Sequence, residues 1–457
     1  MTTSNWAGVR VAVIGLARSG VSACLFLRKR GAVVTGTDRR TADQLDAVAS
    51  DLQSAGVTLS LGDYPNLDAF EALVLSPGVD PTQEPIARAR ENGVRIVAEL
   101  ELGANEAKGR IVCITGTKGK STTTMSLHAM LREAGVDARA VGNIGDPITA
   151  HLEGSDEKTV FVVEASSFQL EITEAFHPNC AVFLNLFPDH LDRHPSFESY
   201  AAAKARIFAN QTPQDTAIIN GDEPKVVEIA RQTRANVIPF YPRTTPVAGS
   251  PASYFDSANA VMRTDAKNLL FSRADVMIPG AAVQTNLLAA ATAAHEIGAP
   301  AAAIQNAVRT FRGVAHTFER LGEIHGVVFF NDSKATTLES VAVALTSFDT
   351  PVLAIMGGRL KTGSFRTLRE AVSARTRVIY AIGESRGLIR EALADICPVH
   401  EADTLEGAVR EAYAAAKSGD TILLSPGCTS FDMFRDYADR GETFRSTFRE
   451  LSLEGAA

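Results

Sequence analysis

Short runs of apolar, often β-branched residues alternate with Ala-, Leu- and Arg-rich stretches along almost the whole chain. The runs are apolar throughout rather than alternating with polar positions, which is typical of strands buried on both faces of a parallel sheet. Ten strands are predicted, at 9–14, 32–37, 72–75, 111–114, 160–163, 181–186, 327–330, 352–356, 377–382 and 421–424. The alternation of strands with helical stretches predicts an α/β protein.

Two breaks in this alternation predict three domains. The first break is the polar stretch 103–109, although a linker helix over 100–107 places the boundary earlier, near Glu99. The second break lies at 312–315, after an Ala-rich helix predicted at 281–303 and before another unit that begins with a strand. The predicted domains are 1–99, 100–313 and 314–457.

The stretch 242–265 is rich in Pro, Thr, Ser and Ala, and it is predicted to be a surface excursion of the middle domain. Predicted helices and strands alternate again after this stretch. The 457 residues of the chain are enough for three domains of ordinary size.

Composition and charge exclude several classes of protein. Hydrophobic residues make up 45% of the chain and charged residues 21%, so it can bury a core and is not a disordered chain. Lys and Arg total 45 against 53 Asp and Glu, which gives a net charge of −8. Non-specific binding to nucleic acid depends on basic patches, so we expect no nucleic-acid partner.

The cysteines are far apart in the sequence and form no CxxC pair, which argues against a zinc site or a disulfide framework and suits a reducing compartment. They are Cys24, Cys113, Cys180, Cys397 and Cys428. The first residues lack a charged segment leading into an apolar core, so no signal peptide is expected. The Ala-rich helix at 281–303 contains Gln284, Asn286, His295 and Glu296, which argues against a membrane span. We expect a cytoplasmic protein with no membrane partner.

The segment Gly15-Leu-Ala-Arg-Ser-Gly20 follows a predicted strand and opens a helix, and Asp38 ends the next strand. This is close to the dinucleotide-binding fingerprint, but the middle glycine of that fingerprint is Ala17, which counts against NAD or FAD and therefore against a dehydrogenase. The helix N-terminus still offers N–H groups to a phosphate, and Arg39 and Arg40 add cations. A tight turn that binds nothing is the alternative for this segment alone.

A second glycine loop, Thr115-Gly-Thr-Lys-Gly-Lys-Ser-Thr122, lies between a predicted strand and a helix that begins near Ser121. Its glycines let backbone N–H groups converge on phosphate oxygens, Lys120 can reach the β- and γ-phosphates, and Ser121 can hold Mg²⁺. The strict phosphate-loop pattern needs glycine where Ile114 stands, so the loop is a shortened variant. A turn that merely carries lysines is the alternative.

Eight motifs, in order and spacing, resemble those of the Mur ligase family of ATP-dependent peptidoglycan-precursor ligases. They are Gly15–Gly20, Leu75-Ser-Pro-Gly78, Thr115–Thr122, Gly142-Asn-Ile-Gly145, Ser166-Ser-Phe-Gln-Leu-Glu171, Asp189-His-Leu-Asp-Arg-His194, Asn331-Asp-Ser-Lys-Ala-Thr336 and Leu424-Ser-Pro-Gly-Cys-Thr-Ser-Phe-Asp432. The resemblance covers nearly the whole chain, and the fifth and eighth motifs favour the branch that adds D-glutamate. It implies an N-terminal Rossmann-like domain, a central P-loop-type ATPase domain with a mostly parallel sheet, and a C-terminal Rossmann-like domain.

The resemblance implies ligation of D-glutamate to UDP-N-acetylmuramoyl-L-alanine. ATP phosphorylates the substrate carboxylate, and the amine of the amino acid then attacks the acyl phosphate. ATP and Mg²⁺ are the implied cofactors, with two metal ions, and we expect a monomer. Two alternatives stay open: a related Mur-type or folylpolyglutamate-type ligase with another amino acid, and a ligase-like UDP-sugar-binding protein without turnover.

The resemblance also assigns site residues. The catalytic residues are Lys120, His190, Lys204, Asp332 and Lys334. ATP is bound by Gly116, Thr117, Lys118, Gly119, Lys120, Ser121, Thr122, Asn286 and Asp332. The UDP-substrate is bound by Gly15, Leu16, Ala17, Arg18, Ser19, Asp38, Arg39, Arg40, Gly78 and Asn143, and D-glutamate by Thr336, Lys361, Ser430 and Phe431. The metal ligands are Ser121, Glu164, His190 and Lys204.

Lys204 is implied to be carbamylated, because an ammonium near Mg²⁺ is repelled whereas a CO₂ adduct is an anionic oxygen ligand. Without the resemblance, Lys204 would be a solvated helix lysine and Glu164 a surface charge at a strand end.

Two stretches depart from the family pattern, and of the first, Gly-x-His-Asn-x-x-Asn, residues 280–286 keep only Gly280 and Asn286. The Asn of Gly-x-His-Asn-x-x-Asn is Val283 here, and the Arg of His-Arg-x-Glu is Thr317. The lost side chains would contact the nucleotide and its phosphates, so the changes bear on ATP affinity. Arg312 and Arg320 are the candidates to substitute for the lost Arg.

Overall fold

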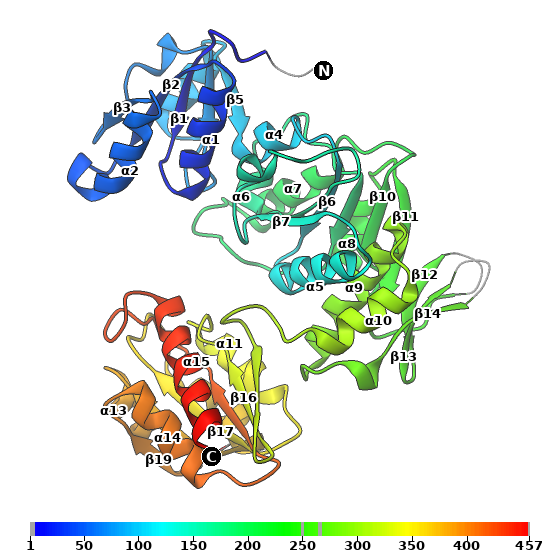
Figure 1. Cartoon of the computed structure of the whole chain (residues 1–457), viewed down its shortest axis with the longest axis vertical. Helices are drawn as coiled ribbons and strands as arrows, with labels where there is room; N and C mark the ends of the chain where they lie inside the picture. Colours follow the sequence, from blue (N-terminus) through cyan, green and yellow to red (C-terminus); the bar gives the residue numbers. More distant parts are fainter. Residues whose placement is uncertain (1–4, 248–250, 264–266, 456–457) are drawn as a thin grey trace. The chain divides into compact units, whose positions relative to one another are not determined.

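The computed structural model describes residues 5–247, 251–263 and 267–455. It contains three separate sheets with helices on their faces, which confirms the predicted α/β class (Figure 1). The first sheet has the order β3-β2-β1-β4-β5 and is parallel throughout. Its strands are β1 (Arg10–Ile14), β2 (Val33–Asp38), β3 (Thr58–Leu61), β4 (Ala72–Leu75) and β5 (Arg95–Ala98), and its helices α1 (Arg18–Lys29), α2 (Ala42–Ser54) and α3 (Glu84–Glu91).

The strand order of the first sheet reverses at β1, because β2 and β3 lie on one side of it and β4 and β5 on the other. Val11 and Val13 of β1 pack with α1 and α2 on one face, and Ala12 and Ile14 pack with α3 on the other. Ligands of open parallel sheets bind where the order reverses, beyond the carboxyl ends of the strands. This places the expected binding crevice above β1 and β4.

The second sheet has nine strands in the order β14-β13-β12-β11-β10-β9-β6-β8-β7. Its parallel part comprises β6 (Arg110–Thr115), β7 (Ala138–Gly142), β8 (Val160–Glu164), β9 (Cys180–Phe183), β10 (Thr216–Asn220) and β11 (Asn236–Tyr241). The helices of this region are α4 (Glu99–Ala104), α5 (Lys120–Glu133), α6 (Ser167–Leu170), α7 (Phe197–Ala205), α8 (Pro224–Ala230), α9 (Ala281–Ile297) and α10 (Ala301–Thr310). Helices α4, α6, α7 and α8 bury apolar residues against one face of the sheet.

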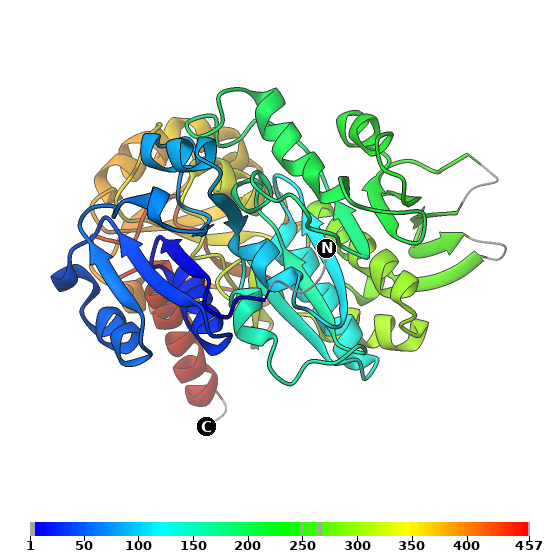
Figure 2. The ribbon, with the colours of Figure 1, turned by 90° about the horizontal axis from the view of Figure 1, so that it is seen from above.

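The prediction of a surface excursion at 242–265 is wrong for 252–263, and its residues 248–250 and 264–265 lie outside the described ranges. Part of that stretch forms β12 (Ala252–Asp256) and β13 (Asn259–Arg263), and β14 (Lys267–Ser272) follows them. β12 is parallel to β11, and the next two strands are antiparallel, so the three extend the sheet at one edge (Figures 1 and 2). Polar residues such as Ser253, Asp256 and Asn268 interrupt these short strands, so none of them has more than three consecutive apolar residues to indicate a buried strand.

The Ala-rich helix predicted at 281–303 is two helices. α9 ends at Ile297 and α10 begins at Ala301. Gly298 between them has φ +101°, a left-handed value that ends helices, and Pro300 cannot continue a helix. The linker helix predicted at 100–107 is the shorter α4, and Lys204, expected on a helix, lies on α7, which a 3₁₀ turn, Arg206–Phe208, follows.

The third sheet has the order β15-β16-β20-β17-β18-β19 and is parallel except for β15. Its strands are β15 (Glu319–Ile324), β16 (Val327–Asn331), β17 (Val352–Gly357), β18 (Thr376–Ile382), β19 (Val399–Glu401) and β20 (Thr421–Leu424). Its helices are α11 (Leu338–Thr346), α12 (Arg369–Arg375), α13 (Arg386–Leu393), α14 (Leu405–Ala415) and α15 (Tyr437–Glu454). Helices α14 and α15 pack together on one face (Figure 1).

The chain divides into two compact units, Met1–Arg273 with Thr285–Val308, and Ala274–Gln284 with Arg309–Ala457. The first unit therefore holds the first two sheets and the second unit holds the third. None of the helices in the described part of the chain combines the length and the hydropathy that crossing a bilayer needs.

Candidate active site

A cleft of about 510 Å³ opens at the carboxyl ends of β1 and β4, where the strand order reverses. It collects all but two of the residues predicted to bind the UDP-substrate. Those in its lining are Gly15, Ala17, Arg18, Ser19, Asp38, Arg39, Gly78 and Asn143. Leu16 and Arg40 line a neighbouring cavity instead.

The turn between β1 and α1 is tight because Gly20 packs on its first residue. A Cβ on Gly20 would lie 1.8 Å from the Gly15 carbonyl oxygen, and Ser76 Oγ donates a hydrogen bond to the same oxygen over 2.7 Å. Ala17 is the N-cap of α1, with extended backbone angles. The turn therefore presents the start of α1 to the cleft, the place where a phosphate is favoured.

The Asp38 carboxylate is hydrogen-bonded to nearby residues of the first domain. Its carboxylate accepts hydrogen bonds from the Leu16 N–H over 2.7 Å and from the Arg40 guanidinium over 2.8 and 3.0 Å. Burial acts to raise the pKa of Asp38, but these hydrogen bonds outweigh it and lower the pKa to about 2. The carboxylate therefore holds the Gly15–Gly20 turn and the Arg40 guanidinium to each other.

The sequence analysis missed Tyr64 and Gln83, which also line this cleft. Tyr64 donates from its hydroxyl to Gln83 Oε1 over 3.1 Å, and Arg39 donates to the same oxygen over 2.5 Å. The Arg39 guanidinium also lies 5.5 Å from the centre of the Tyr64 ring. An aromatic face beside a cation suits a nucleobase, but Tyr64 lies in no recognisable motif.

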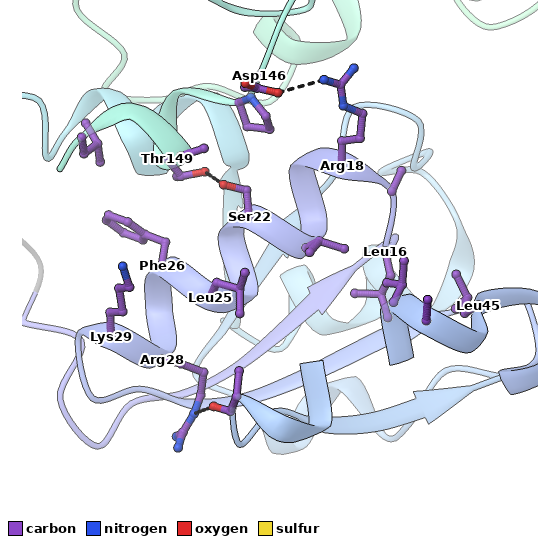
Figure 3. Close-up of a pocket in the computed structure, with 18 of the residues that line it drawn as sticks. Leu16, Arg18, Ser22, Leu25, Phe26, Arg28, Lys29, Leu45, Asp146 and Thr149 are labelled. Atoms are coloured by element: carbon purple, nitrogen blue, oxygen red, sulfur yellow. Dashed lines mark hydrogen bonds and ion pairs between the residues drawn. The ribbon is translucent and has the colours of Figure 1, made fainter. Parts of the chain in front are cut away.

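A second cavity, of about 1590 Å³, lies along α1 (Figure 3). One face of α1 is bonded across it to residues 146–153, which include the 3₁₀ helix η2 (Ile148–His151). Arg18 pairs with Asp146 at 2.8 Å, the Ser22 and Thr149 hydroxyls lie 2.7 Å apart, and Lys29 pairs with Glu153 at 3.0 Å. These bonds join the first sheet's domain to residues that follow β7.

The Thr149 hydroxyl also donates to Glu99 Oε1 over 2.9 Å. Glu99 begins α4, which joins β5 to β6, and it is buried. Burial raises the pKa of Glu99 to about 7, against the opposing effect of the Thr149 hydrogen bonds. A titratable carboxyl therefore lies in the connection between the first two sheets.

The predicted phosphate loop joins β6 to α5 at the carboxyl edge of the second sheet. Gly119 is the N-cap of α5 with φ +87°, and a Cβ there would lie 2.3 Å from Asn286 Oδ1, so this position requires glycine. Lys120 Nζ donates to the carbonyl oxygens of Gly116 and Thr117, over 3.0 Å in each case. The structure thus places Asn286 of α9 against the loop. Asn286 and the loop residues 116–122 are both predicted to bind ATP.

Glu164 ends β8 and is 1% exposed, not the surface charge that a strand-end Glu usually is. Its Oε1 accepts a hydrogen bond from Asn143 Nδ2 over 2.7 Å. Its Oε2 is buried and has no hydrogen-bond partner among the residues that the structure describes. An unpaired buried carboxylate oxygen is costly unless another group completes it, so Glu164 fits a cation.

Lys204 of α7 is also buried, with 1% of its side chain exposed. Its Nζ donates to the Gly116 carbonyl oxygen over 2.8 Å and lies 4.9 Å from the centre of the Tyr200 ring. Burial, with the nearby positive charge of Lys120, lowers the pKa of Lys204 to about 7. A neutral amine is the form that adds CO₂, so the environment fits a carbamate.

The ring of His190 lies 5.0 Å from that of Phe168 and 6.4 Å from that of Tyr200. His190 is exposed and has φ +54°, an uncommon value for a residue other than glycine. Within the described ranges, no three His, Cys, Asp or Glu side chains are grouped as a metal site. A metal here therefore also needs oxygen ligands of other kinds, such as the Ser121 hydroxyl or a carbamate on Lys204.

In the second unit, the loops after β16, β17 and β20 are bonded together at the carboxyl edge of the third sheet. The Gly427 N–H donates to the Ala335 carbonyl over 2.9 Å, and Arg359 and Thr429 exchange two backbone hydrogen bonds of 3.0 Å. These loops carry all the residues predicted for D-glutamate, which are Thr336, Lys361, Ser430 and Phe431. Ser430 is buried, whereas Lys361 and Phe431 are exposed.

Asp332, at the end of β16, is buried and accepts hydrogen bonds from the Phe318 N–H over 3.0 Å and from Ser425 Oγ over 3.1 Å. Burial raises the pKa of Asp332 to about 7, although these hydrogen bonds oppose the rise. Lys334 is exposed two residues later. A carboxyl and a cation thus stand at the same edge as the predicted amino-acid pocket.

Comparison with known proteins decides the family. Residues 9–98 match a model of the Mur ligase MurD-like N-terminal domain, 114–294 the Mur ligase middle domain, and 317–428 the Mur ligase glutamate ligase domain. A UDP-N-acetylmuramoylalanine–D-glutamate ligase of Solibacter usitatus is 40% identical over 97% of this chain and 98% of its own length. The chain belongs to the Mur ligase family. A ligase of the same name from Acidobacterium capsulatum is 39% identical over 98% of both chains.

Solved structures share the fold of this Mur ligase. A UDP-N-acetylmuramate–alanine ligase of Thermotoga maritima aligns with 97% of this chain and 99% of its own, with a TM-score of 0.59 and 16% identity. The MurF ligase of Thermotoga maritima in complex with ADP covers 93% of this chain and 96% of its own, with a TM-score of 0.58 and 16% identity. At these identities the likeness extends to the fold alone.

Both stretches in which this Mur ligase departs from the family pattern contain buried atoms at the changed position. Val283 is buried on α9. The Thr317 hydroxyl oxygen is buried and has no hydrogen-bond partner in the described part of the chain. Arg320 pairs with Glu323 at 3.2 Å, and Arg312 donates to the Arg309 carbonyl over 2.9 Å.

Another residue that the sequence analysis missed is Arg440 of α15, which is 1% exposed. Its guanidinium donates to Ser333 Oγ, to the Ser333 carbonyl and to the Cys428 carbonyl, over 3.0, 2.7 and 3.1 Å. Burial lowers the pKa of Arg440 to about 10. It holds the loop of Asp332 and the loop of Ser430 to each other.

Proposed function

We propose that this Mur ligase joins D-glutamate to UDP-N-acetylmuramoyl-L-alanine, driven by ATP, in the synthesis of peptidoglycan precursors. The observation that carries the proposal is the agreement among its curated relatives. Eight of them, 36–40% identical over 96–98% of this chain, have the name UDP-N-acetylmuramoylalanine–D-glutamate ligase. This agreement disfavours a related ligase with another amino acid.

The cleft above β1 and β4 is the proposed site for the UDP portion of the substrate. The start of α1 offers N–H groups and Arg18, Arg39 and Arg40 offer cations to the pyrophosphate, while Asp38 holds the turn in place. Asn143 reaches from this cleft to Glu164. The substrate's carboxylate end would thereby be led from the first domain toward the phosphate loop.

The loop 116–122 is the proposed site for the ATP phosphates, with Asn286 beside it and Lys120 as the cation for the β- and γ-phosphates. Mg²⁺, the metal that this family uses, supplies charge neutralisation for the phosphates and for the developing acyl phosphate. Ser121 and Glu164 would hold one ion, and His190 with Lys204 a second. In the second unit, Asp332 and Lys334 are proposed to face ATP and the acyl phosphate.

Lys204 is proposed to act as its carbamate. The neutral amine adds to the carbon of CO₂: a C–N bond forms, one C=O π bond opens onto oxygen, and one proton leaves to solvent, so the neutral side chain becomes an anionic carbamate. Starting from the ammonium form, a second proton leaves to solvent before the addition. Its lowered pKa supports this step, because about half of such a group is unprotonated at neutral pH. The carbamate would supply an anionic oxygen ligand for the second ion, beside His190.

Thr336, Lys361, Ser430 and Phe431 are proposed to form the D-glutamate pocket. A dicarboxylate needs cations and hydroxyl donors, and Lys361, Thr336 and Ser430 provide them. We further propose that the domain limits are 1–99, 100–313 and 314–457 and that the enzyme acts as a monomer in the cytoplasm.

Phosphate release with UDP-N-acetylmuramoyl-L-alanine, measured across a panel of D- and L-amino acids, tests the function. We expect phosphate only when both the UDP-substrate and D-glutamate are present, together with a product larger by one glutamyl residue in mass spectrometry. Release with L-alanine or a diamino acid instead would replace the proposal with a related ligase. Binding of the UDP-substrate without phosphate release would indicate a protein that has lost turnover.

A further inference from the structure

The side chain of Asn185, which follows β9, is built into the phosphate loop. Its Oδ1 accepts hydrogen bonds from the backbone N–H of Thr117 over 3.0 Å and of Lys118 over 2.9 Å. Its Nδ2 donates to the Lys118 carbonyl oxygen over 3.0 Å. One amide group thus satisfies two donors and one acceptor of the loop, although it stands 67 residues or more from them in sequence.

These contacts decide which part of the loop is left for an anion. Successive backbone N–H groups in a glycine loop form a concave donor pair that ordinarily faces a phosphate. Here the pair from Thr117 and Lys118 faces the Asn185 oxygen, so a phosphate is directed to the following residues, where α5 begins at Lys120. Asn185 does not line the cleft of the UDP-substrate.

Thr117 ties the same two segments together a second time. Its hydroxyl oxygen accepts a hydrogen bond from the Phe187 N–H over 3.0 Å and lies 3.1 Å from the Tyr200 hydroxyl. Phe187 is three residues before His190, and Tyr200 is four residues before Lys204. Hydrogen bonds of Asn185 and Thr117 therefore connect the loop proposed for the ATP phosphates to the segments that carry His190 and Lys204.

We propose that Asn185 is a positioning residue for ATP. It holds the phosphate loop in its binding shape and at a fixed position relative to the segment that carries His190, without touching the substrate. The inference rests on the proposed function, because it takes the loop to be the ATP site. Loss of the amide leaves the Lys118 N–H and carbonyl oxygen without this partner, while the Thr117 N–H keeps only the Asn185 backbone carbonyl oxygen, 3.1 Å away. The loop then relaxes away from the phosphate-binding shape.

The test is the affinity of Asn185→Ala for MgADP and, separately, for UDP-N-acetylmuramoyl-L-alanine, by titration calorimetry on the full chain. We expect MgADP binding to weaken roughly 2- to 10-fold, the range for the net loss of an ordinary hydrogen bond, with UDP-substrate binding unchanged. Asn179→Ala is the matched control. Asn179 stands before β9 as Asn185 stands after it, and its Oδ1 accepts from the Ile111 N–H over 2.8 Å. We expect that control to lose some thermal stability and no MgADP affinity.

Asn185→Asp keeps the shape and the acceptor oxygen, so it guards against a variant that fails to fold. It sets a carboxylate oxygen against the Lys118 carbonyl and an extra negative charge near the phosphates, and we expect MgADP affinity to fall with the melting temperature largely kept. Wild-type MgADP affinity in either variant would overturn the inference. Equal losses for MgADP and the UDP-substrate would overturn it in favour of a general structural role. Failure of the wild-type chain to bind MgADP would overturn the proposed function itself, and this inference with it.

Discussion

Asn143 Nδ2 donates a hydrogen bond to Glu164 Oε1 over 2.7 Å. Asn143 follows β7 and lines the cleft proposed for the UDP-substrate, whereas Glu164 ends the neighbouring strand β8 beside the phosphate loop. One contact therefore connects a substrate-binding residue with a proposed metal ligand. It also leaves the second oxygen of Glu164 as the one available to a cation.

Asn143→Ala removes this contact and lets the Glu164 carboxylate turn. We expect the KM for the UDP-substrate to rise about tenfold and the Mg²⁺ concentration for half-maximal activity to rise with it, since a hydrogen bond to a charged group is lost. Steady-state kinetics with varied Mg²⁺ measures both. Asn92→Ala is the control, because Asn92 makes a similar 3.1 Å bond to Asp68 on the surface of the first domain. An unchanged Mg²⁺ requirement in Asn143→Ala would contradict the expected link.

Lys120→Ala tests the phosphate loop. The lysine is the proposed cation for the β- and γ-phosphates, so we expect kcat to fall roughly 10²- to 10³-fold, as for the loss of one donor to a developing charge. The melting temperature should change little. Lys225→Ala removes a surface lysine of α8 that pairs with Glu228, and we expect no effect on kcat. Normal turnover in Lys120→Ala would remove the ATP assignment of this loop.

The lowered pKa of Lys204 predicts that the stability of the protein depends on pH. Its pKa of about 7 lies below the ordinary value of 10.5, so between these pH values the unfolded chain binds more protons than the folded one. The free energy of unfolding should therefore gain a contribution as pH rises from 7 to 10.5, and Lys204→Met should lack it. Urea unfolding in CO₂-free buffer measures the difference, and parallel pH profiles for the two proteins would argue against a buried amine.

The carbamate itself gives a second readout at Lys204. With ¹³C-bicarbonate, wild-type enzyme should show a carbamate carbon signal that Lys204→Ala lacks, and the variant should be inactive at any bicarbonate concentration. Short-chain carboxylates should restore part of the activity by placing an oxygen anion at the metal. Full activity of Lys204→Ala would show that this lysine has no role in the reaction.

Glu99 predicts the opposite dependence on pH. Its pKa of about 7 lies above the ordinary value of 4.5, so the folded chain holds the extra proton between these values. Stability contributed by the protonated carboxyl is present at low pH and is lost as pH rises through 7. Glu99→Gln should flatten the fall in unfolding free energy between pH 4.5 and 7, whereas the exposed Glu91→Gln should not. Identical profiles for Glu99→Gln and wild type would place the titration elsewhere.

Lys361→Met tests the amino-acid pocket. A charge-assisted hydrogen bond is worth about 1.5–3 kcal/mol, so the KM for D-glutamate should rise roughly 10- to 150-fold while that for ATP stays nearly constant. Lys417→Met, at an exposed position of the same sheet's domain, is the control. Equal losses for D-glutamate and ATP would indicate instead a lysine that faces phosphate or supports the fold.

The parallel strands were predictable because each is a continuous apolar run buried on both faces. All ten predicted strands are present, although β9 ends at Phe183 rather than at 186. Other strands escaped prediction, and some of them, such as β10, are as buried as the predicted ones. β7 carries Arg139, and no strand of the β12–β14 extension has more than three consecutive apolar residues. Their place in the sheet is set by pairing with neighbours that a local pattern does not contain.

The glycine loops were predictable from local sequence because their backbone geometry demands glycine at fixed spacings. Residues that support the proposed sites through distant partners were not predictable in this way. Asn185, Tyr64 and Arg440 act through partners that are tens of residues away or more, and each would be an ordinary Asn, Tyr or Arg if only its neighbours in sequence were considered. The resemblance to a family supplied the residues proposed to face ligands, and the fold shows residues that hold their segments in place.

The antiparallel extension β12–β14 has a practical use. Two strands, β10 and β11, separate it from β9, and the phosphate loop lies beyond β9 at β6. The turn between β12 and β13 at Ser257 and Ala258 therefore offers an internal attachment point for a tag or fluorophore. A label there would report on the enzyme in living cells without occupying either chain terminus or the edge of the sheet where ATP is proposed to bind.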